Sequence, residues 1–449
     1  MGSLEDLRLV DGPVVWFSWA AAAAGLAYLL WHGVIRHSVS RHSAARSAAV
    51  VAAVAVLAAA LVAAVHWFLI YAVAVFADEL PWEPLAWSFP AVAALLLWLL
   101  CLAGLHGSGR IRRRLRRSAA ATAAFLAVLT LSAIQINSYF GLNHTVSDLT
   151  GTAVARIQPL EAALTRAAGG PAAIDLARWR APTHLASGVV RKASIPGTVS
   201  GFSSREAYVY LPPAYQSSPR PALPVLVLFS GQPGGPADWL TGGALRNRLD
   251  RFAAGHAGVA PVVVVVDPNG SQSANTLCMD SRIAQADTFL ARDVPDWIKT
   301  TLAVDPDHRQ WAAGGFSFGG TCAMQMVTRH PDLYSAALSF SSEREPALAK
   351  EREKTVEAAF GGDTGAFDRQ PPLHHMAERR FDGHGVYLAV GEDDAEFAGY
   401  MDEIAAAARN AGFAVETRRI ADTGHSWATA ATGLPGGLDF LARRWGITP

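Results

Sequence analysis

Four long segments in the first third of the chain contain no Asp, Glu, Lys or Arg, and no other feature restricts the fold as strongly. The segments are residues 12–35, 47–77, 84–109 and 118–147. A helix of about 20 apolar residues crosses the roughly 30 Å hydrocarbon core of a bilayer. We therefore predict a transmembrane domain at residues 1–140, with four helices at about 14–35, 48–76, 88–106 and 118–138. A cleaved signal peptide is the alternative for the first segment, but that segment lacks a basic start and three more spans follow it.

The loops between these segments differ in charge, and the difference predicts an orientation. The first and third loops, at 36–46 and 110–117, carry three and six arginines and no acid, whereas the second loop and the N-terminal tail are mainly acidic. Arginine close to a span is retained on the cytoplasmic side. We therefore expect an integral plasma membrane protein with its N-terminus and everything after about residue 140 outside the cytoplasm.

The overall composition excludes several classes of function. Thirty-eight basic and thirty-eight acidic residues cancel, so the net charge gives no general attraction to nucleic acid. Three cysteines are too few for a disulfide-rich scaffold, and no CxxC, HExxH or EF-hand spacing occurs. We therefore predict no cofactor and no metal.

The remaining residues alternate between predicted strands and helices. Residues 141–184 are interpreted as a juxtamembrane connector with a short helix at 153–167. After it, apolar runs typical of buried strands lie at 206–215, 223–230, 260–268, 310–315, 334–342, 385–392 and 415–420. Helical patterns lie at 281–302, 318–330, 396–411 and 436–445. Apolar strands separated by helices indicate a mostly parallel sheet covered on both faces, so residues 185–449 are predicted to form a three-layer α/β domain.

One short motif in this domain points to chemistry. The stretch "GGFSFGG" (314–320) follows a predicted strand and opens a predicted helix, which is the setting of a G-x-S-x-G nucleophile elbow. Ser317 is then the candidate nucleophile. The alternative is a Gly-Ser turn that only joins a strand to a helix.

A serine nucleophile needs a base, and the base needs an acid that orients it. In folds of this kind the order along the chain is Ser, acid, His, and His425 follows the last predicted strand. The acid should follow the strand at 385–392, where "GEDDAEF" offers four carboxylates. We choose Asp394, with Asp393 as the close alternative; the others are interpreted as a solvated helix N-terminus.

The oxyanion that forms on the substrate needs backbone N–H donors. One is predicted to be that of Phe318, directly after the nucleophile. The second should come from the loop after the strand at 223–230, where Pro233 has no N–H and Gln232 is the best candidate.

These motifs resemble the esterase family that includes esterase D, the enterochelin esterases and the mycolyltransferases of actinobacterial envelopes. The resemblance covers roughly residues 187–449 and is carried by "VYLPPAY" (209–215), "GGFSFGG", "SFSSEREP" (339–346), "GEDD" (391–394) and "GHSW" (424–427). It implies an α/β hydrolase fold, a triad of Ser317, Asp394 and His425, and acyl transfer to water or to an alcohol.

The combined prediction is a membrane-anchored serine esterase acting on an acyl ester, such as a lipid or envelope glycolipid, at the outer face of the membrane, with membrane lipids as partners. An envelope acyltransferase and a non-catalytic membrane scaffold are the alternatives. Cys101 lies in a predicted span, which leaves Cys278 and Cys322 to form a disulfide if the domain is exported. The alternative for these two is a pair of buried thiols.

Overall fold

The computed structural model describes residues 4–35, 41–104, 111–166 and 174–448. The chain divides into two compact units, Met1–Gly151 and Thr152–Pro449, and the boundary falls inside the predicted connector. Arg36, Arg110 and the "GGP" of the connector (169–171) lie outside the described residues.

The first unit contains the four expected long helices. In the described residues, four helices are long and apolar enough to cross a membrane. They are α1 (Pro13–Gly33), α2 (Arg41–Trp67), α3 (Trp82–Ala103) and α4 (Ile111–Phe140). Five residues in a π-helical turn, Phe68–Ala72, continue α2.

The helix ends differ from the predicted spans in both directions. Helix α3 begins six residues before the predicted start, since Glu83 and Pro84 are accommodated in a first turn. Helix α4 extends beyond the predicted 118–138 at both ends and includes arginines. The predicted second span at 48–76 is wrong at its end, because the helical turns stop at Ala72. Residues 105–106 of the predicted third span lie outside the described residues.

Close packing holds α1 and α4 together in this unit. A Cβ at Gly25 would lie 2.6 Å from the carbonyl oxygen of Ala124, so only glycine permits this approach. Such small-residue contacts are common between membrane helices, where lipid removes the hydrophobic drive for association. Leu29, Leu97 and Val128 fill the core beside this contact.

The N-terminal tail pairs with the segment that follows α4. The Leu9 N–H donates to the His144 carbonyl (2.9 Å), and the Val146 N–H donates to that of Leu7 (3.0 Å). Thr145 and Asp148 then form a capping box at α5 (Val146–Leu149). The chain therefore enters and leaves this helical bundle at the same end.

The second unit is built on an eight-stranded sheet in the order β1-β2-β4-β3-β5-β6-β7-β8. The strands are β1 (Val189–Ala193), β2 (Ala207–Leu211), β3 (Val225–Phe229), β4 (Val262–Val266), β5 (Trp311–Phe316), β6 (Ala336–Phe340), β7 (Gly385–Gly391) and β8 (Ala414–Ile420). β1 pairs antiparallel with β2, and β2 with β4, while all other neighbours are parallel. Strands β3 to β7 are fully buried, as their apolar runs predicted.

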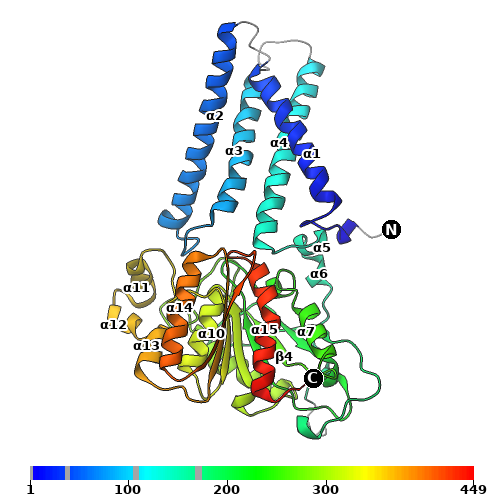
Figure 1. Ribbon diagram of the computed structural model, residues 1–449, viewed down its shortest axis with the longest axis vertical. Coiled ribbons are helices and arrows are strands. Elements are labelled where there is room, and N and C mark those ends of the chain that lie inside the picture. Colours follow the sequence, from blue (N-terminus) through cyan, green and yellow to red (C-terminus); the bar gives the residue numbers. More distant parts are fainter. Residues whose placement is uncertain (1–3, 36–40, 105–110, 167–173, 449) are drawn as a thin grey trace. The chain divides into compact units, whose positions relative to one another are not determined.

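Helices cover both faces of this sheet (Figure 1). Helix α15 (Trp427–Trp445) packs beside α7 (Leu245–Ala254), whereas α10 (Phe318–Arg329) packs with α13 (Pro372–Glu378), which also contacts α14 (Ala395–Asn410). The shorter helices are α6 (Thr152–Ala155), α8 (Ala286–Thr288), α9 (Val294–Thr301), α11 (Arg352–Phe360) and α12 (Thr364–Asp368). The predicted fold class, four apolar helices followed by a mostly parallel α/β domain, is confirmed.

Some predicted elements are wrong in extent. The helix expected at 153–167 ends at Ala155, because Pro159 lacks an N–H and disfavours helix at the preceding residue. The helix expected at 436–445 begins already at Trp427 and accommodates Pro435. The helix expected at 281–302 is preceded by a loop up to Gln285.

Candidate active site

Ser317 stands alone between β5 and α10 in a conformation that few side chains adopt. Its φ is 56° and its ψ −123°, a left-handed region that costs about 1–3 kcal/mol for a residue with a Cβ. The Ser317 N–H donates to the Phe340 carbonyl (2.8 Å), and its own carbonyl accepts from Gly320 and Thr321. These bonds fix the sharp bend that projects the hydroxyl above the carboxyl edge of the sheet.

The glycines around Ser317 are required by close backbone approaches. A Cβ at Gly315 would lie 2.1 Å from the Gly319 carbonyl oxygen, and one at Gly319 would lie 2.3 Å from that of Phe229. The first helical turn therefore rests directly on the strand before it and on the end of β3. This explains the G-x-S-x-G spacing physically.

The structure brings the three predicted triad residues together. Oγ of Ser317 lies 2.8 Å from Nε2 of His425, and Nδ1 of His425 lies 2.9 Å from Oδ2 of Asp394. Asp394 sits at the N-cap of α14, three residues after the end of β7, and its side chain is 8% exposed. The hydroxyl, imidazole and carboxylate therefore form one continuous hydrogen-bonded chain.

The geometry also separates the four acids of "GEDDAEF". Glu392, Asp393 and Glu396 are exposed, and only Asp394 is buried. Glu396 instead accepts hydrogen bonds from Lys350 and Tyr400, and these contacts lower its pKa against the opposing effect of burial. Asp394 is thus the one carboxylate of this cluster in contact with His425.

The two predicted oxyanion donors lie beside a switch point of the sheet. Strands β3 and β5 are neighbours, and the chain leaves them toward opposite edges, which is where α/β sheets open a crevice. The loop after β3 reaches Ser317: a Cβ at Gly231 would lie 3.7 Å from Cβ of Ser317. In the described part of the chain, the N–H groups of Phe318 and Gln232 donate to no backbone carbonyl.

Two aromatic rings lie beside the imidazole of His425, and the sequence analysis did not predict them. The ring of Phe397 lies 4.1 Å from that of His425, and the ring of Phe316 lies 5.2 Å from it, between centroids. Phe397 follows Asp394 by three residues on one helix, and this spacing is the signal that could have identified it. These two rings pack beside the imidazole, whose side chain remains 19% exposed.

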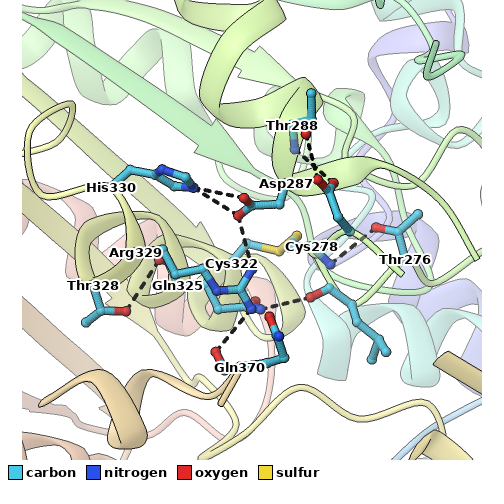
Figure 2. A network of polar contacts seen from close by, with 12 residues as sticks. Thr276, Cys278, Asp287, Thr288, Cys322, Gln325, Thr328, Arg329, His330 and Gln370 are labelled. Carbon is cyan, nitrogen blue, oxygen red and sulfur yellow. Dashed lines mark hydrogen bonds and ion pairs between the residues drawn. A yellow bond between two sulfur atoms is a disulfide. The ribbon is translucent and has the colours of Figure 1, made fainter. Parts of the chain in front are cut away.

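A disulfide and an ion cluster hold the nucleophile helix α10 along its length. Cys278 and Cys322 are joined, with their Cα atoms 5.5 Å apart, and Gln325 donates to the Leu277 carbonyl. At the far end of the helix, Arg329 and His330 contact the carboxylate of Asp287. Figure 2 shows these contacts together.

Within the ranges that the structure describes, no three His, Cys, Asp or Glu side chains are grouped so that they could hold a metal ion. The hydroxyl of Ser317, the imidazole of His425 and the carboxylate of Asp394 offer nucleophilic and acid–base chemistry.

Comparison with known proteins agrees with this chemistry. The family described as "Putative esterase" matches residues 202–436, more than half of the chain. An uncharacterized protein of Corynebacterium glutamicum is 37% identical over 256 residues, covering 56% of this chain and 60% of that protein. The MPT51 antigen of Mycobacterium leprae is 33% identical over 105 residues, 23% of this chain and 32% of that protein. The chain thus covers less than two thirds of these relatives.

Among solved structures, a ferulic acid esterase superposes with a TM-score of 0.50 at 22% identity. The match covers 58% of this chain and 99% of that one, so the shared part is the α/β fold. From the family match over residues 202–436, we conclude that this chain belongs to the family described as "Putative esterase".

Proposed function

We propose that the protein is a membrane-anchored serine esterase that hydrolyses an acyl ester at the outer face of the membrane. The observation that carries the proposal is the hydrogen-bonded chain from Ser317 through His425 to Asp394 at the carboxyl edge of the sheet. A chain of this kind is what converts a weakly nucleophilic hydroxyl into an attacking group.

The roles follow from the geometry. Oγ of Ser317 attacks the ester carbonyl carbon while Nε2 of His425 takes its proton, and Asp394 holds the imidazole with Nδ1 protonated. The N–H groups of Phe318 and Gln232 stabilise the oxyanion. His425 then gives its proton to the departing alcohol, the C–O ester bond breaks, and an acyl-serine remains. Water, deprotonated by His425, releases the carboxylic acid and restores Ser317.

Two features of the first unit support the membrane anchor. Three tryptophan side chains are exposed near helix ends at one end of the bundle: Trp16 is 73% exposed, Trp82 72% and Trp67 59%. Tryptophan is enriched at membrane interfaces. The tail and the segment after α4 pair at this same end, which supports an even number of spans. A substrate with a lipid or glycolipid ester would then be concentrated near the site.

The direct test uses full-length protein in detergent. Wild type should hydrolyse p-nitrophenyl butyrate and be labelled covalently by a fluorophosphonate, whereas Ser317→Ala should lose both activities. Ser147→Ala, in the first unit, is the matched control and should retain both. If wild type is neither labelled nor active, the non-catalytic alternative replaces the proposal.

The anchor and the outer location need separate tests. The protein should stay with the membrane fraction after carbonate extraction, and alkaline phosphatase fused after residue 449 should be active. A cytoplasmic fusion signal would overturn the proposed orientation. Product analysis with an added sugar or lipid alcohol then distinguishes hydrolysis from transfer, because a transferase would form the new ester in preference to free acid.

A further inference from the structure

Arg205, just before β2, makes a set of contacts behind the loop that follows β3. Its Nη2 donates to the Gly234 carbonyl at 2.8 Å, and its Nη1 donates to Oε1 of Gln272 at 3.3 Å. Gly234 in turn donates its N–H to the Gln272 carbonyl. The guanidinium therefore joins the Gly234 segment to the neighbouring loop at Gln272.

A buried carboxylate fixes this guanidinium in place. Asp267, directly after β4, is fully buried and accepts from Nε (2.7 Å) and Nη2 (2.9 Å) of Arg205 as well as from its backbone N–H (3.0 Å). The carboxylate of Asp267 also accepts hydrogen bonds from the N–H groups of Asn269 and Gly270. This bidentate geometry suits arginine and not lysine.

The loop fits tightly against the guanidinium. A Cβ at Gly235 would lie 2.8 Å from Nη1 of Arg205, and one at Gly234 would lie 2.5 Å from Oδ2 of Asp238. Asp238 accepts from the Gly235 N–H on the other side. The loop thus runs between a cation and a carboxylate, and both contacts are made by its backbone.

The near end of the same loop lies at the nucleophile. Gly231 approaches Ser317, and the side chain of Gln232 donates to the Ser273 carbonyl (3.1 Å). Gln232 lies only two positions before Gly234, whose carbonyl Arg205 binds. A shift of that carbonyl therefore moves the Gln232 N–H relative to Ser317.

We propose that Arg205 is a positioning residue that holds the loop after β3 so that the Gln232 N–H faces the developing oxyanion. The inference rests on the proposed serine esterase function. Removal of one oxyanion donor lowers kcat by about 10²–10³. A loop that holds this donor less firmly should therefore lower kcat by about tenfold or more.

Arg205→Lys keeps the charge beside Asp267 and loses the fork that reaches Gly234. We expect kcat for p-nitrophenyl butyrate, per fluorophosphonate-titrated site, to fall about tenfold or more, with KM changed by less than about threefold. The Ki of an alkyl trifluoromethyl ketone, whose adduct with Ser317 carries the oxyanion, should rise in parallel. Arg309→Lys is the matched control, since Arg309 forms a similar forked pair with Asp307 on an exposed surface.

Gly235→Ala disturbs the same contact from the loop side, because the added methyl displaces Nη1 of Arg205. It should also lower kcat, and it tests the role of Arg205 if Arg205→Lys does not fold. The inference is overturned if both variants keep kcat within about twofold of wild type, or if kcat falls while the ketone Ki is unchanged. Loss of wild-type activity and labelling would instead refute the proposed function itself.

Discussion

Replacement of Asp394 by asparagine tests the most specific feature of the site. The carboxylate is buried, and Oδ2 lies 2.9 Å from Nδ1 of His425. Asparagine has the same shape but no charge, and its amide can present N–H groups to Nδ1 and so favour the wrong imidazole tautomer. Asp393 is the neighbouring residue and is exposed, which makes Asp393→Asn the matched control.

The expected loss can be worked from this geometry. When His425 takes the proton of Ser317, an imidazolium forms with its charge about 4 Å from that of the carboxylate. Two such charges attract by about 4 kcal/mol at an effective dielectric constant of about 20. Loss of this attraction in the transition state lowers kcat by roughly 10³-fold, and the wrong tautomer increases the loss toward about 10⁴.

The assay is steady-state hydrolysis of p-nitrophenyl butyrate by detergent-solubilised full-length protein, with thermal unfolding measured on the same samples. We expect Asp394→Asn to lose about 10³ in kcat and Asp393→Asn to stay within about twofold. If Asp394→Asn retains kcat within about tenfold of wild type while folded, or if Asp393→Asn loses as much, the proposed role of Asp394 is wrong.

Three further predictions concern stability. Burial raises the pKa of Asp238 to about 6, so the folded protein holds this proton more tightly than the unfolded chain, whose aspartates titrate near about 3.9. This group therefore lowers the free energy of unfolding by up to about 3 kcal/mol as pH rises from about 4 to 6. In urea unfolding, Asp238→Asn should be more stable than wild type at pH 8 but not at pH 4. An equal difference in stability at both pH values would contradict this. The disulfide joins cysteines 44 positions apart, so Cys278→Ala/Cys322→Ala should lose about 2–4 kcal/mol in calorimetry, and an unchanged Tm would show that the bond does not brace the fold. Arg329→Met removes one of the two ion pairs that Arg329 and His330 form with the partly buried carboxylate of Asp287, and it should cost about 3 kcal/mol. Arg329→Met/Asp287→Leu should restore most of this loss, and a double variant as unstable as the single one would refute the pairing argument.

The elements that were predicted correctly depend on local patterns. Uninterrupted apolar runs gave the buried strands β3 to β7, and the four uncharged segments gave α1 to α4. The errors fall where local signals are weak or conflict. Strand β1 and helix α7 were not predicted. Strand β1 contains two basic residues and is half-exposed, and α7 is a short amphipathic helix with four charged residues. The helix predicted at 436–445 extends back to Trp427 through Pro435, because one face of α15 packs on the sheet.

The sequence alone indicated the four membrane-length helices and the elbow at Ser317, because each depends on residues that are neighbours in the chain. The order of nucleophile, acid and base could also be predicted, because each of the three follows a strand with a recognisable apolar run. Tertiary structure decided which acid of "GEDDAEF" is buried beside His425, and it brought Arg205 to the Gly234 carbonyl 29 positions away. Burial and hydrogen-bond direction arise only when β3, β4, β5 and β7 are aligned in one sheet. Local patterns along the chain do not predict how these distant strands align.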